Sequence, residues 1–222
     1  MDIYWGVPRN SVSNESSRKR RRISYDEPSD KKKKLFEFED ELIYSVGTQV
    51  HFTAEINQDT IETLIKEITK VVNDNLPKFG TKKEEKVTIQ YIVDSPGGSV
   101  TSVLKFVDFI RLVKERHPHI EFHSIITGMA ASAGTIMCII ADKRFITKHA
   151  FAMIHELSSG NMGSYTKLMS YTDFLNKMHN ALLDIYLGKC SQDKESLEAL
   201  LLKESWFTAE QYMELGFVDE IK

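Results

Sequence analysis

At 222 residues, the chain is long enough for one domain of ordinary size with its own core, plus an appendage. The net charge of −3 is unevenly spread, because residues 1–34 hold ten of the 29 Lys and Arg but only five of the 32 acidic residues. Residues 35–222 therefore carry a net charge of −8. An acidic body of this kind argues against a nucleic-acid-binding core. Two cysteines are too few for a disulfide framework and lack zinc-site spacing, so we expect a cytoplasmic protein. No apolar run approaches the roughly 18 residues of a membrane span, so no membrane segment is expected.

The first 34 residues are predicted to be a disordered basic arm. They contain two blocks of like charge, Arg18–Arg22 and Lys31–Lys34, separated by a short polar spacer. Such blocks do not pack, because burial would strand their charges. Two basic clusters would suit a nuclear address or a contact with nucleic acid. A solvated tail that nothing recognises is an equal alternative.

Residues 35–222 are predicted to form one α/β domain. Alternating or continuous apolar runs predict strands, and apolar positions repeating every three or four residues predict helices. A strand is expected after each early helix, which favours parallel crossings. The expected strands cover residues 42–44, 50–52, 87–94, 120–127, 144–148 and 151–155, and the expected helices cover 57–76, 100–113, 161–187, 195–203 and 208–215.

A serine among small residues follows the strand expected over 120–127. Ser132 lies in the stretch Gly128-Met129-Ala130-Ala131-Ser132-Ala133-Gly134, which leads into an apolar run. At a strand-to-helix turn its hydroxyl and the first backbone N–H groups of the helix would face the same space, where a developing oxyanion is favoured. The simpler alternative is a helix cap, a role for which serine is well suited.

Two further stretches lie at expected strand ends. Pro96-Gly97-Gly98 follows the strand over 87–94, and its glycines can adopt positive φ and bring backbone N–H groups close to a ligand. A tight turn that merely needs glycine is the alternative, and no nucleotide-binding spacing is present. His155 ends another expected strand, where it would serve as a general base. No histidine pair has the H-E-x-x-H spacing of a zinc hydrolase, so no metal site is expected.

Together, these three stretches resemble one family. Ser95-Pro96-Gly97-Gly98-Ser99-Val100, the heptapeptide around Ser132, and Met153-Ile154-His155 occur in the order and at roughly the spacing found in the Clp protease proteolytic subunit. The resemblance extends to Ala54-Glu55-Ile56-Asn57 and to the segment from Phe207 to Asp219. It covers about residues 45–222 and implies a ClpP/crotonase-like fold of repeated β-β-α units. The helix at 161–187 would protrude as a handle.

The resemblance also implies a serine endopeptidase. Ser132 would be the nucleophile, His155 the general base, and the backbone N–H groups of Gly98 and Ala133 the oxyanion hole. For the acid that orients the histidine, an ungapped alignment gives Leu200, which cannot play this role. A deletion would bring Glu204 or Asp193 into place, and Glu204 is favoured.

In the family, heptameric rings stack into a closed barrel, and a separate AAA+ unfoldase uses ATP to feed in unfolded polypeptides. The resemblance therefore implies homo-oligomers, an unfoldase partner and no cofactor in the chain itself. Two alternatives stay open. One is a catalytically inactive subunit or scaffold, suggested by the displaced acid. The other is a crotonase-like acyl-CoA enzyme, which would not explain Ser132 together with His155.

Overall fold

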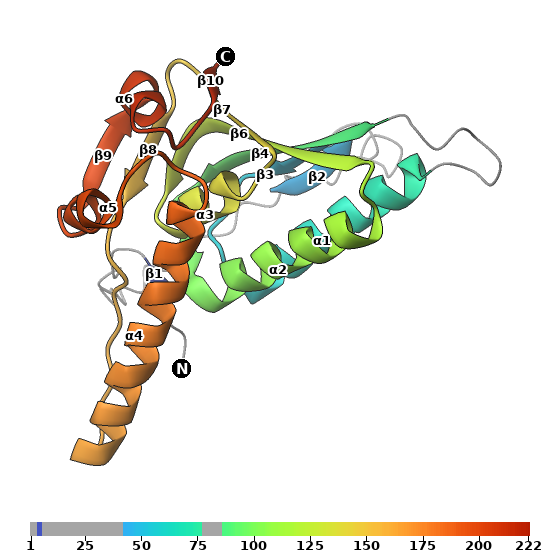
Figure 1. The fold of residues 1–222 in the computed structure, drawn as a ribbon. Helices are drawn as coiled ribbons and strands as arrows, with labels where there is room; N and C mark the ends of the chain where they lie inside the picture. Colours follow the sequence, from blue (N-terminus) through green and yellow to red (C-terminus); the bar gives the residue numbers. More distant parts are fainter. Residues whose placement is uncertain (1–3, 6–41, 77–85) are drawn as a thin grey trace, which may run out of the picture. The chain divides into compact units, whose positions relative to one another are not determined.

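The computed structural model describes residues 4–5, 42–76 and 86–222, and it confirms the mixed α/β class (Figure 1). Its main sheet is mostly parallel. Only the pairs β2–β3 and β8–β9 of this sheet are antiparallel. In spatial order the sheet runs β10 (Glu220–Ile221), β7 (Lys143–Ile146), β6 (Ile120–Ala131), β4 (Val87–Ser95), β3 (Gln49–Phe52) and β2 (Ile43–Val46), with β8 (Phe151–Ile154) between β6 and β9 (Ser205–Thr208).

The central strand β6 is longer than the sequence predicts. The expected strand stops at residue 127, but β6 continues through four small or flexible residues to Ala131. Its first part pairs with β7 through residues 123–126, and its last part pairs with β8 through residues 129–131. Alanine and glycine have low strand propensity, so this extension is caused by pairing with β8, a tertiary effect that a local pattern does not report.

Two helices of the first half lie along one face of the sheet (Figure 1). Helix α1 (Gln58–Asn75) begins at a capping box in which the Asn57 side chain and Thr60 bond each other's backbone N–H groups. Helix α2 (Val100–Arg116) begins at the cap Ser99. Both helices turn their apolar positions to the core, as the spacing predicts. Helix α3 (Ala133–Ile139), which follows β6, is buried along its whole length.

The second half adds three helices. Helix α4 (Tyr165–Leu187) begins four residues later than predicted; its first turns are largely exposed, whereas Leu182 and Tyr186 near its end are buried. Helix α5 (Lys194–Leu201) precedes β9, a strand that the sequence pattern does not predict. Helix α6 (Ala209–Glu214) begins at the predicted capping box of Thr208 and Gln211.

Most of the predicted arm over residues 1–34 lies outside the described residues. The exception is β1 (Tyr4–Trp5), a two-residue strand that pairs with β5 (Gly98–Ser99). Among the described residues, no helix is both long and apolar enough to cross a bilayer. Within the same ranges, no three His, Cys, Asp or Glu side chains are grouped as metal ligands would be.

Candidate active site

The candidate site lies where three neighbouring parallel strands end. In the registers of β4 with β6 and of β6 with β8, Ser95 is opposite Ala130 and Ala131 is opposite Met153. The glycine turn, Ser132 and His155 each follow one of these strands within three residues. Because the carboxyl ends of parallel strands meet at the same edge of a sheet, the fold brings these distant segments together.

Ser132 occupies a strained turn between β6 and α3. Its backbone has φ 56° and ψ −124°, a conformation that non-glycine residues rarely adopt and that costs about 1–3 kcal/mol. Its N–H donates to the carbonyl of Met153 at 2.7 Å, which fixes the turn against β8. The side chain makes no capping hydrogen bond to α3. Ser132 is therefore the N-cap residue of α3 by position, but its hydroxyl does not cap the helix and is directed elsewhere.

The Ser132 hydroxyl faces His155. The Oγ atom lies 2.9 Å from Nε2 of the imidazole, within the range for direct proton transfer. Both side chains are buried: Ser132 has no exposed surface and His155 is 8% exposed. Burial keeps water from competing for this hydrogen bond. The arrangement is therefore that of a hydroxyl whose proton a neighbouring base can accept.

A hydrogen-bond chain that the sequence does not reveal joins the Ser132 turn to α4. The Ser132 carbonyl accepts from both the N–H of Thr135, at 3.0 Å, and its hydroxyl, at 2.6 Å. The same hydroxyl lies 2.5 Å from the Tyr186 hydroxyl on α4. Since the Thr135 proton is directed to the carbonyl, the Tyr186 hydroxyl is the donor in this contact. Burial raises the pKa of Tyr186, which keeps that donor protonated.

The glycine turn leaves no space for side chains. Gly97 and Gly98 have φ angles of 91° and 141°. A Cβ on Gly97 would lie 2.8 Å from the Cβ of Ser132, and one on Gly98 would lie 2.2 Å from the carbonyl oxygen of Ile56. Ile56 also holds the turn by donating to the Gly97 carbonyl and accepting from the Ser99 N–H, both at 2.7 Å. Glycine is required here because the backbone approaches both Ile56 and Ser132.

The same contacts place the turn beside the first residue of α3. The position of a Cβ on Gly97 is 3.1 Å from the backbone nitrogen of Ala133. The two N–H groups expected to form an oxyanion hole, those of Gly98 and Ala133, therefore belong to segments in direct contact with each other and with Ser132.

The acid candidates lie in different settings. Glu204 directly precedes β9, where Ser205 is paired with Ile154. In this antiparallel register the next pair would be Glu204 and His155, and the backbone of Glu204 has a positive φ of 48°. The Glu204 side chain is exposed.

Asp193 instead caps α5 by accepting a 2.8 Å hydrogen bond from the Ser196 N–H, which lowers the pKa of Asp193. Leu200 lies within α5.

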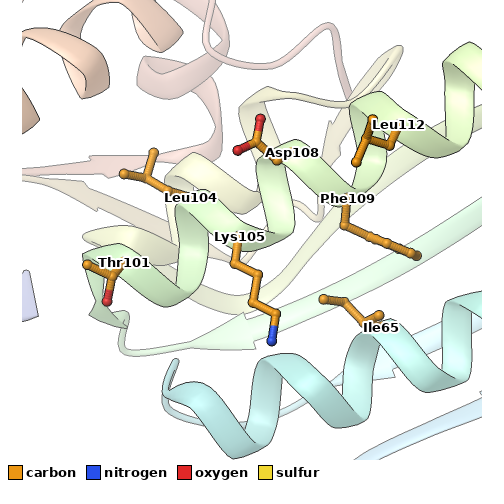
Figure 2. A pocket seen from close by; sticks show the side chains of 7 residues that line it. All are labelled: Ile65, Thr101, Leu104, Lys105, Asp108, Phe109 and Leu112. Atoms are coloured by element: carbon orange, nitrogen blue, oxygen red, sulfur yellow. The ribbon is translucent and has the colours of Figure 1, made fainter.

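A surface hollow in another part of the domain carries no comparable chemistry. It lies between α1 and α2 and is lined mainly by apolar side chains, among them Ile65, Leu104 and Phe109 (Figure 2). Lys105 at its edge forms an ion pair with Glu62 at 3.0 Å. No nucleophile and base come together at this hollow, so the Ser132 and His155 pair is the stronger candidate.

Known proteins of one family are similar to most of the chain. A model of the Clp protease family matches residues 47–222. The ATP-dependent Clp protease proteolytic subunit 1 of Chlamydia trachomatis is 31% identical to the chain over 137 residues, which cover 60% of the chain and 69% of that relative. The ATP-dependent Clp protease proteolytic subunit of Streptococcus pneumoniae is 30% identical over 182 residues, covering 75% of the chain and 90% of the relative. The family match spans Gly98, Ser132 and His155.

Proposed function

The chain belongs to the Clp protease family, and on this premise we propose that it is a proteolytic subunit that hydrolyses peptide bonds as a serine endopeptidase. The observation that carries the proposal is the 2.9 Å separation between Ser132 Oγ and His155 Nε2 in a buried, strained turn. A serine hydroxyl is a poor nucleophile unless a base accepts its proton, and this pair supplies both groups.

The proposed reaction proceeds through an acyl-enzyme. Ser132 Oγ attacks the peptide carbonyl while its proton moves to His155 Nε2. The carbonyl oxygen becomes an oxyanion, and the N–H groups of Gly98 and Ala133 donate hydrogen bonds to it. His155 then gives the proton to the leaving amine, and the peptide C–N bond breaks. In the second half, His155 accepts a proton from water as the water oxygen attacks the ester carbonyl. The ester bond to Ser132 Oγ then breaks, the new carboxyl terminus leaves, and His155 returns the proton to Ser132 Oγ.

Glu204 is the proposed acid that orients His155. Its support is the β8–β9 register, which would place its backbone opposite His155. The residue after His155 is tied to the same region, because the Glu156 N–H donates to the Leu201 carbonyl at 2.9 Å. The Glu204 side chain is exposed, so it would have to turn toward the imidazole to act. Ordering of this segment on assembly would favour that rotamer.

Assembly and partners are proposed by analogy with the family. The names of the two relatives describe ATP-dependent proteolytic subunits. Stacked heptameric rings of this chain would enclose the active sites, and a separate AAA+ unfoldase would consume ATP and deliver unfolded polypeptide. The exposed apolar residues in the first turns of α4, among them Tyr165, Leu168 and Met169, would be covered by another subunit. We place the assembly in the cytoplasm, with a nuclear location as the alternative suggested by Arg18–Arg22 and Lys31–Lys34.

A catalytically inactive subunit or scaffold is the second candidate, and the exposed side chain of Glu204 favours it. A fluorophosphonate probe separates the two candidates, because it reacts only with an activated serine. The assembled wild-type protein should be labelled, and Ser132→Ala of equal particle mass should not. Hydrolysis of a labelled peptide should show the same dependence on Ser132. An unlabelled wild-type assembly would exclude the peptidase and leave the scaffold.

A further inference from the structure

The N-terminal strand β1 lies against the glycine turn of the candidate site. Tyr4 is paired with Ser99 and Trp5 with Gly98, in antiparallel orientation. The two partners are separated by more than 90 residues along the chain, so the pairing is a long-range contact rather than a local hairpin. It adds a strand to the edge of β5 that does not contact Ile56.

The backbone of the turn explains why this edge accepts a strand. The Gly97 carbonyl and the Ser99 N–H both bond to Ile56. In an extended strand, the N–H and C=O groups of successive residues point to opposite edges. The N–H and C=O of Gly98 therefore point away from Ile56, toward the edge on which Trp5 is its partner.

This edge coincides with the proposed substrate site. The N–H of Gly98 is one of the two proposed oxyanion donors, and the turn is in contact with Ser132. An extended peptide substrate that presents its carbonyl to the Gly98 N–H would use this same edge of β5, and strand addition is a common way for a peptide to bind an open sheet edge. Residues 4–5 and such a substrate would then compete for the same hydrogen-bonding groups.

We propose that Tyr4–Trp5 is a built-in competitive inhibitor that occupies the peptide-binding edge of β5 until a substrate displaces it. The proposal rests on the peptidase function proposed above. An attached segment competes at an effective concentration that is set by the chain linking it to the domain, without a separate binding partner. The strength of the inhibition depends on the fraction of molecules in which Tyr4–Trp5 is not paired with β5.

The kinetic consequence is specific. Occupation of the edge raises the apparent KM by the inverse of the open fraction and leaves kcat unchanged, because a saturating substrate displaces the segment. A segment that occupies the edge nine-tenths of the time would raise KM about tenfold.

Removing residues 1–6 should therefore lower KM for a short peptide substrate by a similar factor at constant kcat. Trp5→Pro in the full chain should have the same effect, because proline has no N–H to donate to the Gly98 carbonyl. Ser13→Pro, in the arm beyond the strand, is the matched control and should keep the wild-type KM.

A binding measurement tests the proposal without requiring catalysis. A fluorescent peptide with the sequence of residues 1–8 is titrated into Ser132→Ala protein, with and without residues 1–6, and fluorescence anisotropy is recorded. We expect binding to the shortened protein, much weaker binding to the full chain, and loss of binding when the peptide carries Trp5→Pro. Equal binding by both proteins would overturn the inhibitor proposal, as would an unchanged KM in an active shortened enzyme. If the peptide binds as expected but no form of the protein reacts with a fluorophosphonate, the proposed peptidase function is wrong. The pairing of residues 4–5 with β5 would still stand.

Discussion

Ser132 Oγ and His155 Nε2 form a 2.9 Å hydrogen bond although 23 positions separate the two residues. The contact follows from the pairing of Ala131 with Met153, which places the two strand ends side by side. The strained φ of Ser132 then turns its side chain toward the imidazole rather than into α3. The strain is therefore part of what makes the hydroxyl available to a base.

Replacement of His155 by Gln should remove the proton acceptor while keeping the side chain similar in size. We expect kcat for a peptide substrate to fall by a factor of about 10² to 10⁴, the usual contribution of general acid–base catalysis. Fluorophosphonate labelling should slow in parallel. His149→Gln is the matched control, since this histidine is exposed. A His155→Gln enzyme with normal kcat would mean that another group activates Ser132.

Gly98→Ala should disrupt the turn that carries the proposed oxyanion donor. The new Cβ would lie 2.2 Å from the Ile56 carbonyl oxygen, a distance that forces the backbone to move. We expect activity to fall at least tenfold, and the melting temperature to fall as well. Gly160→Ala is the control, because nothing lies within 4 Å of a Cβ at that position. Peptide hydrolysis and thermal unfolding of both variants are measured together, and equal behaviour of the two would contradict the tight approach at Gly98.

Glu204→Gln tests the proposed orienting acid. If Glu204 fixes the imidazole, loss of its charge should lower kcat well over tenfold with little effect on folding. Asp193→Asn is a sharp comparison, because Asn caps a helix about as well as Asp and only the charge is removed. Its kcat should stay within about twofold of the wild-type value. The reverse result, with Asp193→Asn impaired and Glu204→Gln normal, would assign the acid to Asp193.

The parts of the site predicted from sequence are those that depend on local chemistry. A serine between alanines, two consecutive glycines and a histidine at a strand end are visible as residues, and their roles came from their joint resemblance to a family. The supports of the site depend on contacts between distant segments. The bond between Thr135 and Tyr186 joins α3 to α4, and a hydrophobic position on an amphipathic helix does not reveal a hydroxyl partner.

Strand β9 was missed for a similar reason. Ser205-Trp206-Phe207-Thr208 is only four residues long and lies between two helices, so its pattern is too short to distinguish a strand from a loop. It is a strand because β8 provides a partner. The position of Glu204 relative to His155 depends on this pairing, which counting along the sequence from His155 or from Thr208 does not reveal.

Tyr186→Phe should weaken the support behind Ser132. The substitution removes the donor to Thr135 but keeps the buried ring, so we expect a loss of about 0.5–1.5 kcal/mol in the free energy of unfolding. Urea unfolding followed by circular dichroism measures this loss. Tyr44→Phe, at an exposed position on β2, should change stability by less than about 0.5 kcal/mol. A neutral Tyr186→Phe would show that the hydrogen-bond chain does not contribute to the stability of the turn.

The ion pair of Arg144 with Asp219 should make stability depend on pH. Asp219 accepts hydrogen bonds from the Arg144 N–H at 2.8 Å and from its guanidinium, and its own N–H donates to the Arg144 carbonyl. Burial raises the pKa of Asp219, but the hydrogen bonds and charge of Arg144 outweigh this effect and lower the pKa below its usual value. The stabilisation is therefore present above the unfolded pKa of about 3.9 and is lost as pH falls through the lower folded pKa.

Asp219→Asn should accordingly be less stable than wild type at pH 7, by about 1 kcal/mol given the partial exposure of the carboxylate. The difference should shrink as pH falls below about 4, because the wild-type carboxylate becomes neutral as well. Thermal melts of both proteins at pH 7 and at pH 3 measure this convergence. Asp173→Asn, which removes an exposed helical pair with Lys177, should change little at either pH. A constant gap between Asp219→Asn and wild type across this range would mean that the contribution of Asp219 does not come from its charge.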